Sequence, residues 1–256
     1  MDGNSNFAFQ VPLLQAISDW QRGDENRERG ALLGEALKAA CAGLPATFKT
    51  CASVCYRRIT LDKRGMWKLL AENALGEKIS SWTTDIEIAK GLKGGIPAKD
   101  ETPKKQATIF NLIPAPGSVI VNLSALYQDP GFCAAMQANS FLIKDYSLGA
   151  GRYWDVEEEV VIEVDTVATA HILSMGDYSS DFDEIVATAA RHMYGPALTP
   201  EQLEAFRRAT ESARGSAGAA WLSPEAFQRV LVRLQPHIVR LREIKQLQDE
   251  ARAQGK

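Results

Sequence analysis

The sequence predicts an α+β protein, with a central β-sheet between helical segments at the two ends of the chain. Three observations predict this class: helical spacing of apolar residues at the start, short β-rich runs in the middle, and helix start signals near the end. We expect an N-terminal helical segment over 1–47, a core over 48–176 and a C-terminal helical region over 177–256. A chain of 256 residues can bury an apolar core without stabilising disulfides.

The opening segment is predicted to be helical from Val11 to about Gly43. Its apolar residues recur every three or four positions, as on one face of a helix, and a Gly-Leu-Pro stop signal follows. The residues of this pattern are Leu32, Leu33, Ala36, Leu37, Ala40 and Cys41.

The middle of the chain is predicted to hold the sheet, because its apolar runs are short, rich in β-branched residues and separated by turn residues. The expected strands are Ala52–Thr60, Ala107–Ile113, Ser118–Leu123, Phe141–Tyr146 and Glu159–Val167. The expected helices are Met66–Ala74 and Asp85–Leu92, and the expected exposed loop is Gly94–Lys105. Thr83 or Thr84 is expected to cap the second helix, with Glu87 as the capping-box partner of Thr84.

Two sequence patterns near the C-terminus are typical of the start of a helix. In Thr199-Pro200-Glu201-Gln202 the threonine can cap a helix, proline takes the first position and the glutamine completes a capping box. Ser223-Pro224-Glu225 opens a long helix, in which Pro236 should produce a kink. The region is either a helical cap on the sheet or a surface that binds a partner or oligomerises.

Composition limits the classes of partner and the location. With 29 basic and 32 acidic residues the net charge is −3, so contact with nucleic acid has to be local. Apolar runs are far shorter than the roughly 20 residues that cross a bilayer, and no membrane contact is expected. The first residues do not resemble a signal peptide, so we expect a cytoplasmic location, with delivery into a target cell by an unseen route left open. The cysteines, expected to be reduced core thiols, are Cys41, Cys51, Cys55 and Cys133.

Two arginines, Arg57 and Arg58, follow Tyr56 at the end of an otherwise apolar run. A guanidinium held on a strand can bind a phosphate or carboxylate through two parallel hydrogen bonds. The alternative is that both arginines are solvated at the edge of the sheet.

Hydroxyl side chains crowd the segment from 80 to 84, where a strand is expected to meet a helix. Helix capping accounts for only some of these hydroxyls, because it does not explain why a serine stands at position 81, next to Trp82. Ser81 is therefore a candidate for a functional site.

Three consecutive carboxylates, Glu157, Glu158 and Glu159, precede the apolar run Val160-Val161-Ile162. Strand alternation would send Glu157 and Glu159 to one face and Glu158 to the other. When two carboxylates lie only a few ångströms apart, their repulsion raises the pKa of one of them unless a cation or a ligand offsets the charge. The segment is either a solvated charged edge or a functional pair of glutamates.

Taken in this order, the motifs resemble the Arg-Ser-Glu group of mono-ADP-ribosyltransferases, which includes bacterial toxins, bacteriophage enzymes and vertebrate ecto-enzymes. The family's aromatic-Arg pair is matched by Tyr56-Arg57, its Ser-Thr-Ser motif by Ser81-Trp82-Thr83 with Ala89 in the following helix, and its Glu-x-Glu motif by Glu157-Glu158-Glu159. The stretch Ile109–Leu126 is similar to the family's middle strands. The resemblance covers about residues 50 to 167. Trp82 and Arg58 depart from the family pattern, so Arg58 stays an alternative to Arg57.

The resemblance implies that 48–176 is a catalytic core with the family's split β-sheet and that NAD is the substrate, without a metal. It implies that Glu159 stabilises the oxocarbenium-like transition state and that Ser81 orients this glutamate. Arg57 is expected to clamp the pyrophosphate. Tyr56, Trp82 and Thr83 are expected to complete the NAD site.

The acceptor is expected to be an arginine side chain of a macromolecule, because Glu157 can orient a guanidinium and remove a proton from it. Tyr153 and Trp154 are expected to contact the acceptor from a mobile loop over Gly149–Asp155. Three alternatives stay open: transfer to a nucleic acid, NAD glycohydrolase activity with water as acceptor, and an inactive binding protein on the same fold.

Overall fold

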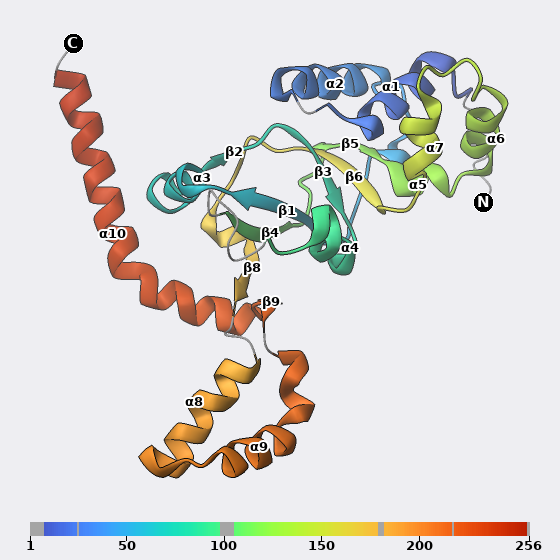
Figure 1. Cartoon of the computed structure of the whole chain (residues 1–256). Helices are drawn as coiled ribbons and strands as arrows, with labels where there is room; N and C mark the ends of the chain where they lie inside the picture. Colours follow the sequence, from blue (N-terminus) through green and yellow to red (C-terminus); the bar gives the residue numbers. More distant parts are fainter. Residues whose placement is uncertain (1–7, 25, 98–104, 179–181, 217, 255–256) are drawn as a thin grey trace.

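A seven-stranded antiparallel sheet with the strand order β5-β6-β3-β1-β4-β8-β9 lies at the centre of the protein (Figure 1). The computed structural model describes residues 8–24, 26–97, 105–178, 182–216 and 218–254. The strands are β1 (Cys55–Leu61), β3 (Ile79–Thr83), β4 (Gln106–Leu112), β5 (Val119–Asn122), β6 (Glu159–Glu163), β8 (Ile172–Tyr178) and β9 (Ala219–Trp221). A separate two-stranded sheet pairs β2 (Leu75–Gly76) with β7 (Thr166–Val167). The α+β class predicted from the sequence is confirmed.

The large sheet is split between β3 and β1. Within the described residues these strands share a single pair, Tyr56 with Thr83, whereas β1 pairs with β4 along its whole length and β3 does the same with β6. Beyond that pair β1 and β3 diverge, and the sheet divides into a β5-β6-β3 half and a β1-β4-β8-β9 half. The divergence leaves room for a cleft in the middle of the sheet.

Two helices at the start of the chain, α1 (Val11–Arg22) and α2 (Arg27–Ala40), pack with α5 (Leu123–Tyr127), α6 (Pro130–Ala138) and α7 (Ala150–Tyr153). Asn26 begins α2 by accepting hydrogen bonds from the backbone N–H of Glu28 and Arg29. The expected helical opening segment is therefore confirmed as two helices. Because these helices share one apolar core with elements more than 80 residues further on, they are part of the fold rather than an addition.

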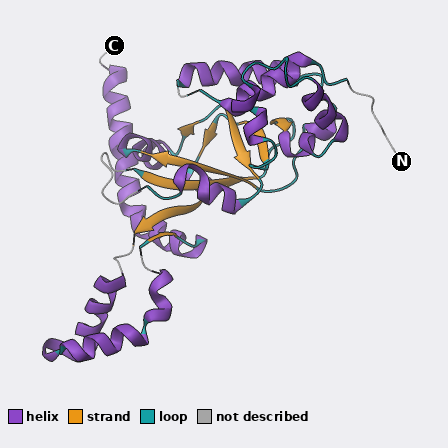
Figure 2. Ribbon diagram, turned by 45° about the vertical axis from the view of Figure 1, so that its right-hand side comes forward, coloured by secondary structure: helices purple, strands orange, loops and turns teal. Residues whose placement is uncertain are grey.

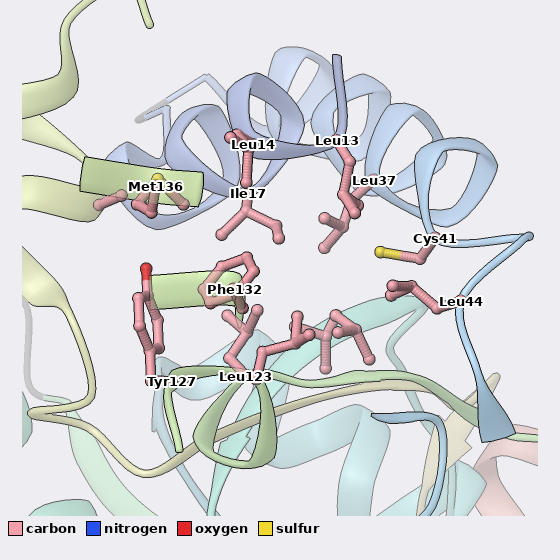
Figure 3. Close-up of a cluster of buried hydrophobic side chains, with 14 of the residues drawn as sticks. Leu13, Leu14, Ile17, Leu37, Cys41, Leu44, Leu123, Tyr127, Phe132 and Met136 are labelled. Carbon is pink, nitrogen blue, oxygen red and sulfur yellow. The ribbon is translucent and has the colours of Figure 1, made fainter. Parts of the chain in front are cut away.

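Figure 3 shows this N-terminal core, in which side chains of α1 and α2 face side chains of α5 and α6. The residues labelled there are Leu13, Leu14, Ile17, Leu37, Cys41, Leu44, Leu123, Tyr127, Phe132 and Met136. A second apolar core includes Trp82, Phe110 and Val160 of the sheet and Phe227 of the last helix. The two cores together hold the sheet and the N-terminal helices in a fixed arrangement.

The C-terminal region combines helices with an edge of the sheet. Helices α8 (Phe182–Tyr194) and α9 (Pro200–Ala209) project away from the sheet in both overall views (Figures 1 and 2). The long helix α10 (Pro224–Gln254) contains Pro236 and is bent, and it packs against β8 with Phe227 and Ile238 buried. The expected helical cap on the sheet is thus formed by α10, whereas α8 and α9 do not cover the sheet. No helix in the described ranges combines the length and apolar character needed to cross a membrane.

Several expected elements are confirmed in place. The expected helix Met66–Ala74 corresponds to α3 (Lys63–Trp67) and a π-helical turn over Lys68–Glu72. The expected helix Asp85–Leu92 corresponds to α4 (Ile86–Gly91). Thr199 and Gln202 form the expected capping box, and the Ser223 hydroxyl accepts from the backbone N–H of Ala226 at 3.2 Å. In the expected loop Gly94–Lys105, Gly94 ends a short 3-10 turn, and residues 98–104 lie outside the described residues.

The predicted strand Phe141–Tyr146 is wrong. These residues form turns that lead into the 3-10 helix Tyr146–Leu148, and Phe141 and Leu142 are exposed. Asp145 adopts a left-handed backbone with φ of 55°, which no strand permits. The segment turns back toward α1, where the backbone N–H of Lys144 donates to Gln15 at 2.8 Å.

The expected C-terminal helical region over 177–256 is helical for the most part, but it also contributes to the sheet. Strand β8 continues to Tyr178, and the three residues of β9 pair with it. A run of three residues is too short to show strand alternation, so the sequence pattern does not indicate β9.

The expected cap of α4 is wrong as well. Asp85, rather than Thr83 or Thr84, accepts the hydrogen bond from the backbone N–H of Glu87. The Glu87 side chain pairs with Lys90 instead of completing a capping box.

The cysteines of the described chain are all free, as expected. Cys41 and Cys55 are buried, and burial raises the pKa of the Cys41 thiol to about 12. The other two, Cys51 and Cys133, are only half-buried.

Candidate active site

A cleft of about 950 Å³ opens where β1 and β3 diverge, beneath the N-terminal helices. Its walls come from the end of α1, from α2, from β1, from the chain that runs from β2 into β3, from the end of α7, and from the turn that leads into β6. Three strands that are neighbours in the sheet each supply one of the sequence-predicted residues: Arg57 on β1, Ser81 on β3 and Glu159 on β6. Residues 102 positions apart along the chain therefore line one cleft.

The guanidinium of Arg57 is fixed inside the cleft by two partners. Its Nη1 donates to the backbone carbonyl of Ser81 at 2.7 Å, and its Nη2 lies 3.2 Å from a carboxylate oxygen of Glu77. Its Nε is buried and has no hydrogen-bond partner among the described residues. The side chain as a whole stays 27% exposed, so the guanidinium borders the cleft while its position is already set.

Arg58 lies elsewhere. It donates to the backbone carbonyl of Gly95, and burial lowers the pKa of its guanidinium. Among the described residues that line the cleft, Arg57 is present and Arg58 is not. The geometry therefore favours Arg57 over the alternative that the sequence left open.

Glu159 is the most deeply placed carboxylate of the cleft, with a side chain that is only 6% exposed. The Ser81 hydroxyl donates to this carboxylate, and the indole N–H of Trp20 donates to its Oε1 at 2.7 Å. A buried charge needs such partners, because the interior cannot replace the water that it loses. Ser81 and Trp20 thus hold the carboxylate from the sheet and from α1.

Opposing effects bring the pKa of Glu159 close to neutral pH. Burial raises the pKa of this carboxyl to about 7, and the nearby charge of Glu157 acts in the same direction. The hydrogen bonds from Ser81 and Trp20 and the charge of Arg57 oppose this shift. A pKa near 7 means that the ionised and neutral forms are both populated at neutral pH, although the side chain is almost fully buried.

Glu157 lines the same cleft as Glu159, as expected, but strand alternation is not the cause. Strand β6 begins only at Glu159, and Glu157 lies in the preceding turn. Between them Glu158 adopts a left-handed backbone with φ of 43°, and its side chain accepts from the Thr84 hydroxyl at 2.7 Å. Burial raises the pKa of Glu157.

Three residues expected in the NAD site are absent from the described lining of the cleft: Tyr56, Trp82 and Thr83. The Trp82 side chain is 1% exposed, lies in the second apolar core and donates to the Ser80 hydroxyl at 2.9 Å. Thr83 is buried and accepts from the backbone N–H of Asp85. Trp82 and Thr83 are therefore buried next to Ser81 in β3, outside the described lining of the cleft.

The expected mobile loop over Gly149–Asp155 is wrong, because the segment contains helix α7 packed against α1. A Cβ on Gly149 would lie 2.1 Å from the backbone oxygen of Ser18, so this glycine permits a close approach rather than motion. Tyr153 lines the cleft, as expected of an acceptor contact. Trp154 instead packs on Tyr127, with ring centroids 4.8 Å apart, and belongs to the N-terminal core.

Sequence reasoning missed Trp20 and Glu77, which contact Glu159 and Arg57 directly. Neither residue lies in a motif, and no local pattern marks them. It also missed the strongly acidic character of the cleft. Among the described lining residues six are acidic and two are basic. The acidic residues are Asp24, Glu28, Glu35, Glu77, Glu157 and Glu159, and the basic residues are Arg57 and Lys78.

In the described part of the chain no group of three or more histidine, cysteine, aspartate or glutamate side chains is arranged to hold a metal ion.

Comparison with known proteins finds a likeness in structure but none in sequence. No protein-family model matches the sequence, and no curated protein sequence matches it. Among solved structures the chain is similar to the Vis toxin, an ADP-ribosyltransferase from Vibrio splendidus, with 14% identity and a TM-score of 0.27. The match covers 66% of this chain and 61% of the toxin chain.

Proposed function

We propose that this protein is an NAD-dependent mono-ADP-ribosyltransferase, which cleaves the nicotinamide–ribose bond and transfers ADP-ribose to an arginine-like acceptor on a macromolecule. One observation carries the proposal: Arg57, Ser81 and Glu159 meet in a single cleft, where Ser81 contacts both of the other residues. Its hydroxyl holds the glutamate and its carbonyl holds the arginine. This arrangement suits a substrate that carries a pyrophosphate near a reacting ribose.

Glu159 supplies the negative charge that the bond cleavage requires. When the nicotinamide leaves with the electron pair of the glycosidic bond, positive charge develops on the ribose. A buried carboxylate stabilises this charge more strongly than one in water, because little solvent screens it. Only the ionised form can do so, and with a pKa of about 7 for Glu159 the rate should rise with pH through neutrality.

Arg57 is suited to bind the pyrophosphate. Its guanidinium is already oriented by Glu77 and by the Ser81 carbonyl, and its side chain borders the cleft with 27% of its surface exposed. An oriented guanidinium loses less entropy when it binds phosphate than a free one does.

Glu157 supports a guanidinium acceptor. Its carboxylate lies in the turn beside Glu159, and burial raises its pKa and so makes it a better base. As the acceptor nitrogen bonds to the ribose carbon, Glu157 takes the proton that this nitrogen loses. The excess of acidic residues around the cleft also favours a cationic acceptor over an anionic one.

The proposal is tested with purified protein, NAD labelled on its adenosine moiety, and two acceptors: a small guanidino compound and a cell lysate. We expect nicotinamide release and label transfer to the guanidino compound, and label in the lysate that protease rather than nuclease removes. Glu159→Gln should lower both activities by about 10²-fold or more. Glu163→Gln, at the exposed end of the same strand, should leave them nearly unchanged.

Absence of nicotinamide release by the wild-type protein would contradict the proposal. Release without transfer to either acceptor would make the protein an NAD glycohydrolase. Label that only nuclease removes would identify a nucleic acid as the acceptor.

A further inference from the structure

Helix α1 reaches the candidate site through Trp20, which lies in its last turn. The indole N–H of Trp20 donates to Oε1 of Glu159 at 2.7 Å, although the two residues are 139 positions apart. Indole nitrogen is only a donor, so the bond has a defined polarity and requires an acceptor oxygen on Glu159. The contact joins the N-terminal helical segment directly to the residue on which the proposed chemistry depends.

The position of Trp20 is set by contacts on both sides of it. Within α1, Leu14 and Ile17 are fully buried in the N-terminal core. The next residue, Gln21, donates to the backbone carbonyl of Trp154 at 3.1 Å and accepts from the Tyr127 hydroxyl at 2.7 Å. The end of α1 is thereby tied to α5 and to the segment after α7, and the indole cannot easily leave the carboxylate.

The charges around Glu159 come from several elements. Glu157 raises its pKa, whereas Arg57 and the Ser81 hydroxyl lower it. Burial raises the pKa of Tyr127 well above its usual range, and the charge of Glu159 adds to this effect, so that tyrosine is neutral at any pH relevant here. The other titratable side chains that line the same cleft are Asp24, Glu28, Glu35, Glu77, Lys78 and Tyr153.

In this setting the Trp20 bond has an electrostatic effect as well as a packing effect. Burial and the Glu157 charge both favour the neutral carboxyl. A donor to Oε1 favours the ionised form, because a carboxylate accepts a hydrogen bond more strongly than a neutral acid does. The Trp20 N–H and the Ser81 hydroxyl therefore offset a burial that would otherwise neutralise the group.

We propose that Trp20 is a positioning residue for Glu159, whose indole N–H orients Oε1 and keeps the carboxylate ionised, so that helix α1 is part of the active site. As a statement about catalysis, this inference rests on the proposed function. As a statement about the ionisation of Glu159, it can be tested without any activity.

The first test compares the pH dependence of nicotinamide release by Trp20→Phe with that of the wild type. Loss of one hydrogen bond to a charged group should move the midpoint of the acid limb upward by about one pH unit. At about pH 6 the rate should fall about tenfold, and the difference should shrink as the pH rises. Trp221→Phe, the same change on β9, should keep the wild-type midpoint. A Trp20→Phe profile with an unshifted midpoint would overturn the inference.

The second test follows the Glu159 carboxyl itself in the full chain. Glutamate labelled with ¹³C at the carboxyl carbon is titrated by NMR, and the Glu159 signal is assigned by its loss in Glu159→Gln. Trp20→Phe should raise the midpoint of this signal, and an unchanged midpoint would overturn the inference. If the wild type does not cleave NAD, the proposed function fails while this titration still decides the role of Trp20.

A tryptophan analogue that keeps the shape of the side chain allows both tests even if Trp20→Phe misfolds. If Trp20→Phe does not fold, the benzothiophene analogue of tryptophan, with sulfur in place of the N–H, is incorporated at position 20. This analogue removes the donor and retains the ring volume. It should show the same upward shift, and a wild-type midpoint would overturn the inference.

Discussion

Glu77 lies 3.2 Å from Arg57 in an ion pair at the place where β1 and β3 diverge. Both side chains are mostly buried, with exposed fractions of 13% for Glu77 and 27% for Arg57. The pair, together with the bond from Arg57 to the Ser81 carbonyl, orients the guanidinium before any ligand is present. The glutamate also limits the positive charge that the cleft offers to an anion.

Arg57→Lys should raise the apparent KM for NAD by about tenfold or more, with a smaller effect on kcat. A lysine ammonium is a compact point charge, and it cannot keep both Glu77 and the Ser81 carbonyl while also presenting a planar donor pair to a phosphate. Steady-state kinetics of nicotinamide release measure the change.

Arg58→Lys is the matched control, because Arg58 contacts Gly95 and lies outside the described lining of the cleft. Its KM should stay close to that of the wild type. A larger increase for Arg58→Lys than for Arg57→Lys would show that Arg58 is the residue that binds the pyrophosphate.

Glu157→Gln should separate the two activities. Nicotinamide release should continue, because Glu159 is intact and water needs less activation than a guanidinium, while label transfer should fall by about 10²-fold or more. Both quantities are measured in the same reaction. Equal losses would mean that Glu157 also stabilises the ribosyl cation, and the argument for an arginine acceptor would lose its basis.

Glu158→Gln is the control for that experiment. The Glu158 side chain accepts from the Thr84 hydroxyl, a bond that the glutamine oxygen can replace, and it is absent from the described lining of the cleft. Both activities should change by only a few-fold. A loss like that of Glu157→Gln would show that the turn, rather than one carboxylate, is responsible.

Glu159→Gln should make the protein more stable at high pH. The pKa of Glu159 is about 7 in the folded protein and about 4.5 in the unfolded chain. Because the folded pKa is raised, the stability that this group contributes is complete below about 4.5 and is lost as the pH rises through 7. Glutamine does not ionise, so the variant should exceed the wild type by up to about 3 kcal/mol at about pH 8.

Urea unfolding of both proteins at about pH 4 and about pH 8 measures this difference. The gain from Glu159→Gln should be near zero at the lower pH, where the wild-type carboxyl is protonated in both states. A gain that is the same at the two pH values would mean that Glu159 does not titrate near neutrality.

Gly149→Ala should destabilise the contact between α7 and α1. The added Cβ would lie 2.1 Å from the backbone oxygen of Ser18, and a backbone atom cannot rotate away. We expect a loss of about 2 kcal/mol or more and a Tm lower by roughly 5 °C or more in a thermal melt. Gly43→Ala, where a Cβ meets nothing within 4 Å, should leave Tm nearly unchanged. A Gly149→Ala melt like that of the wild type would show that the two helices separate freely.

Two of the three strands that carry the candidate site were predictable because they are local features, whereas β3 (Ile79–Thr83), which carries Ser81, was not among the expected strands. Apolar runs with β-branched residues place Arg57 on one strand and Glu159 at the start of another, and the structure has β1 and β6 there. The capping box of Thr199 and Gln202 was predictable for the same reason, since all its partners lie within four residues. The false strand at Phe141–Tyr146 shows the limit of this reasoning, because an apolar run can also form turns when one side chain is buried and its neighbours are exposed.

The sequence by itself determined the α+β class, the helices at both ends and the set of residues from which a site could be built. Only the tertiary structure decided which of these residues meet. It placed Arg57 rather than Arg58 in the cleft, moved Trp82 and Trp154 into apolar cores, and brought Trp20 to Glu159. The physical reason is that local hydrogen bonding and periodicity act over a few residues, whereas these contacts depend on how α1 packs against the sheet and on where β1 and β3 part.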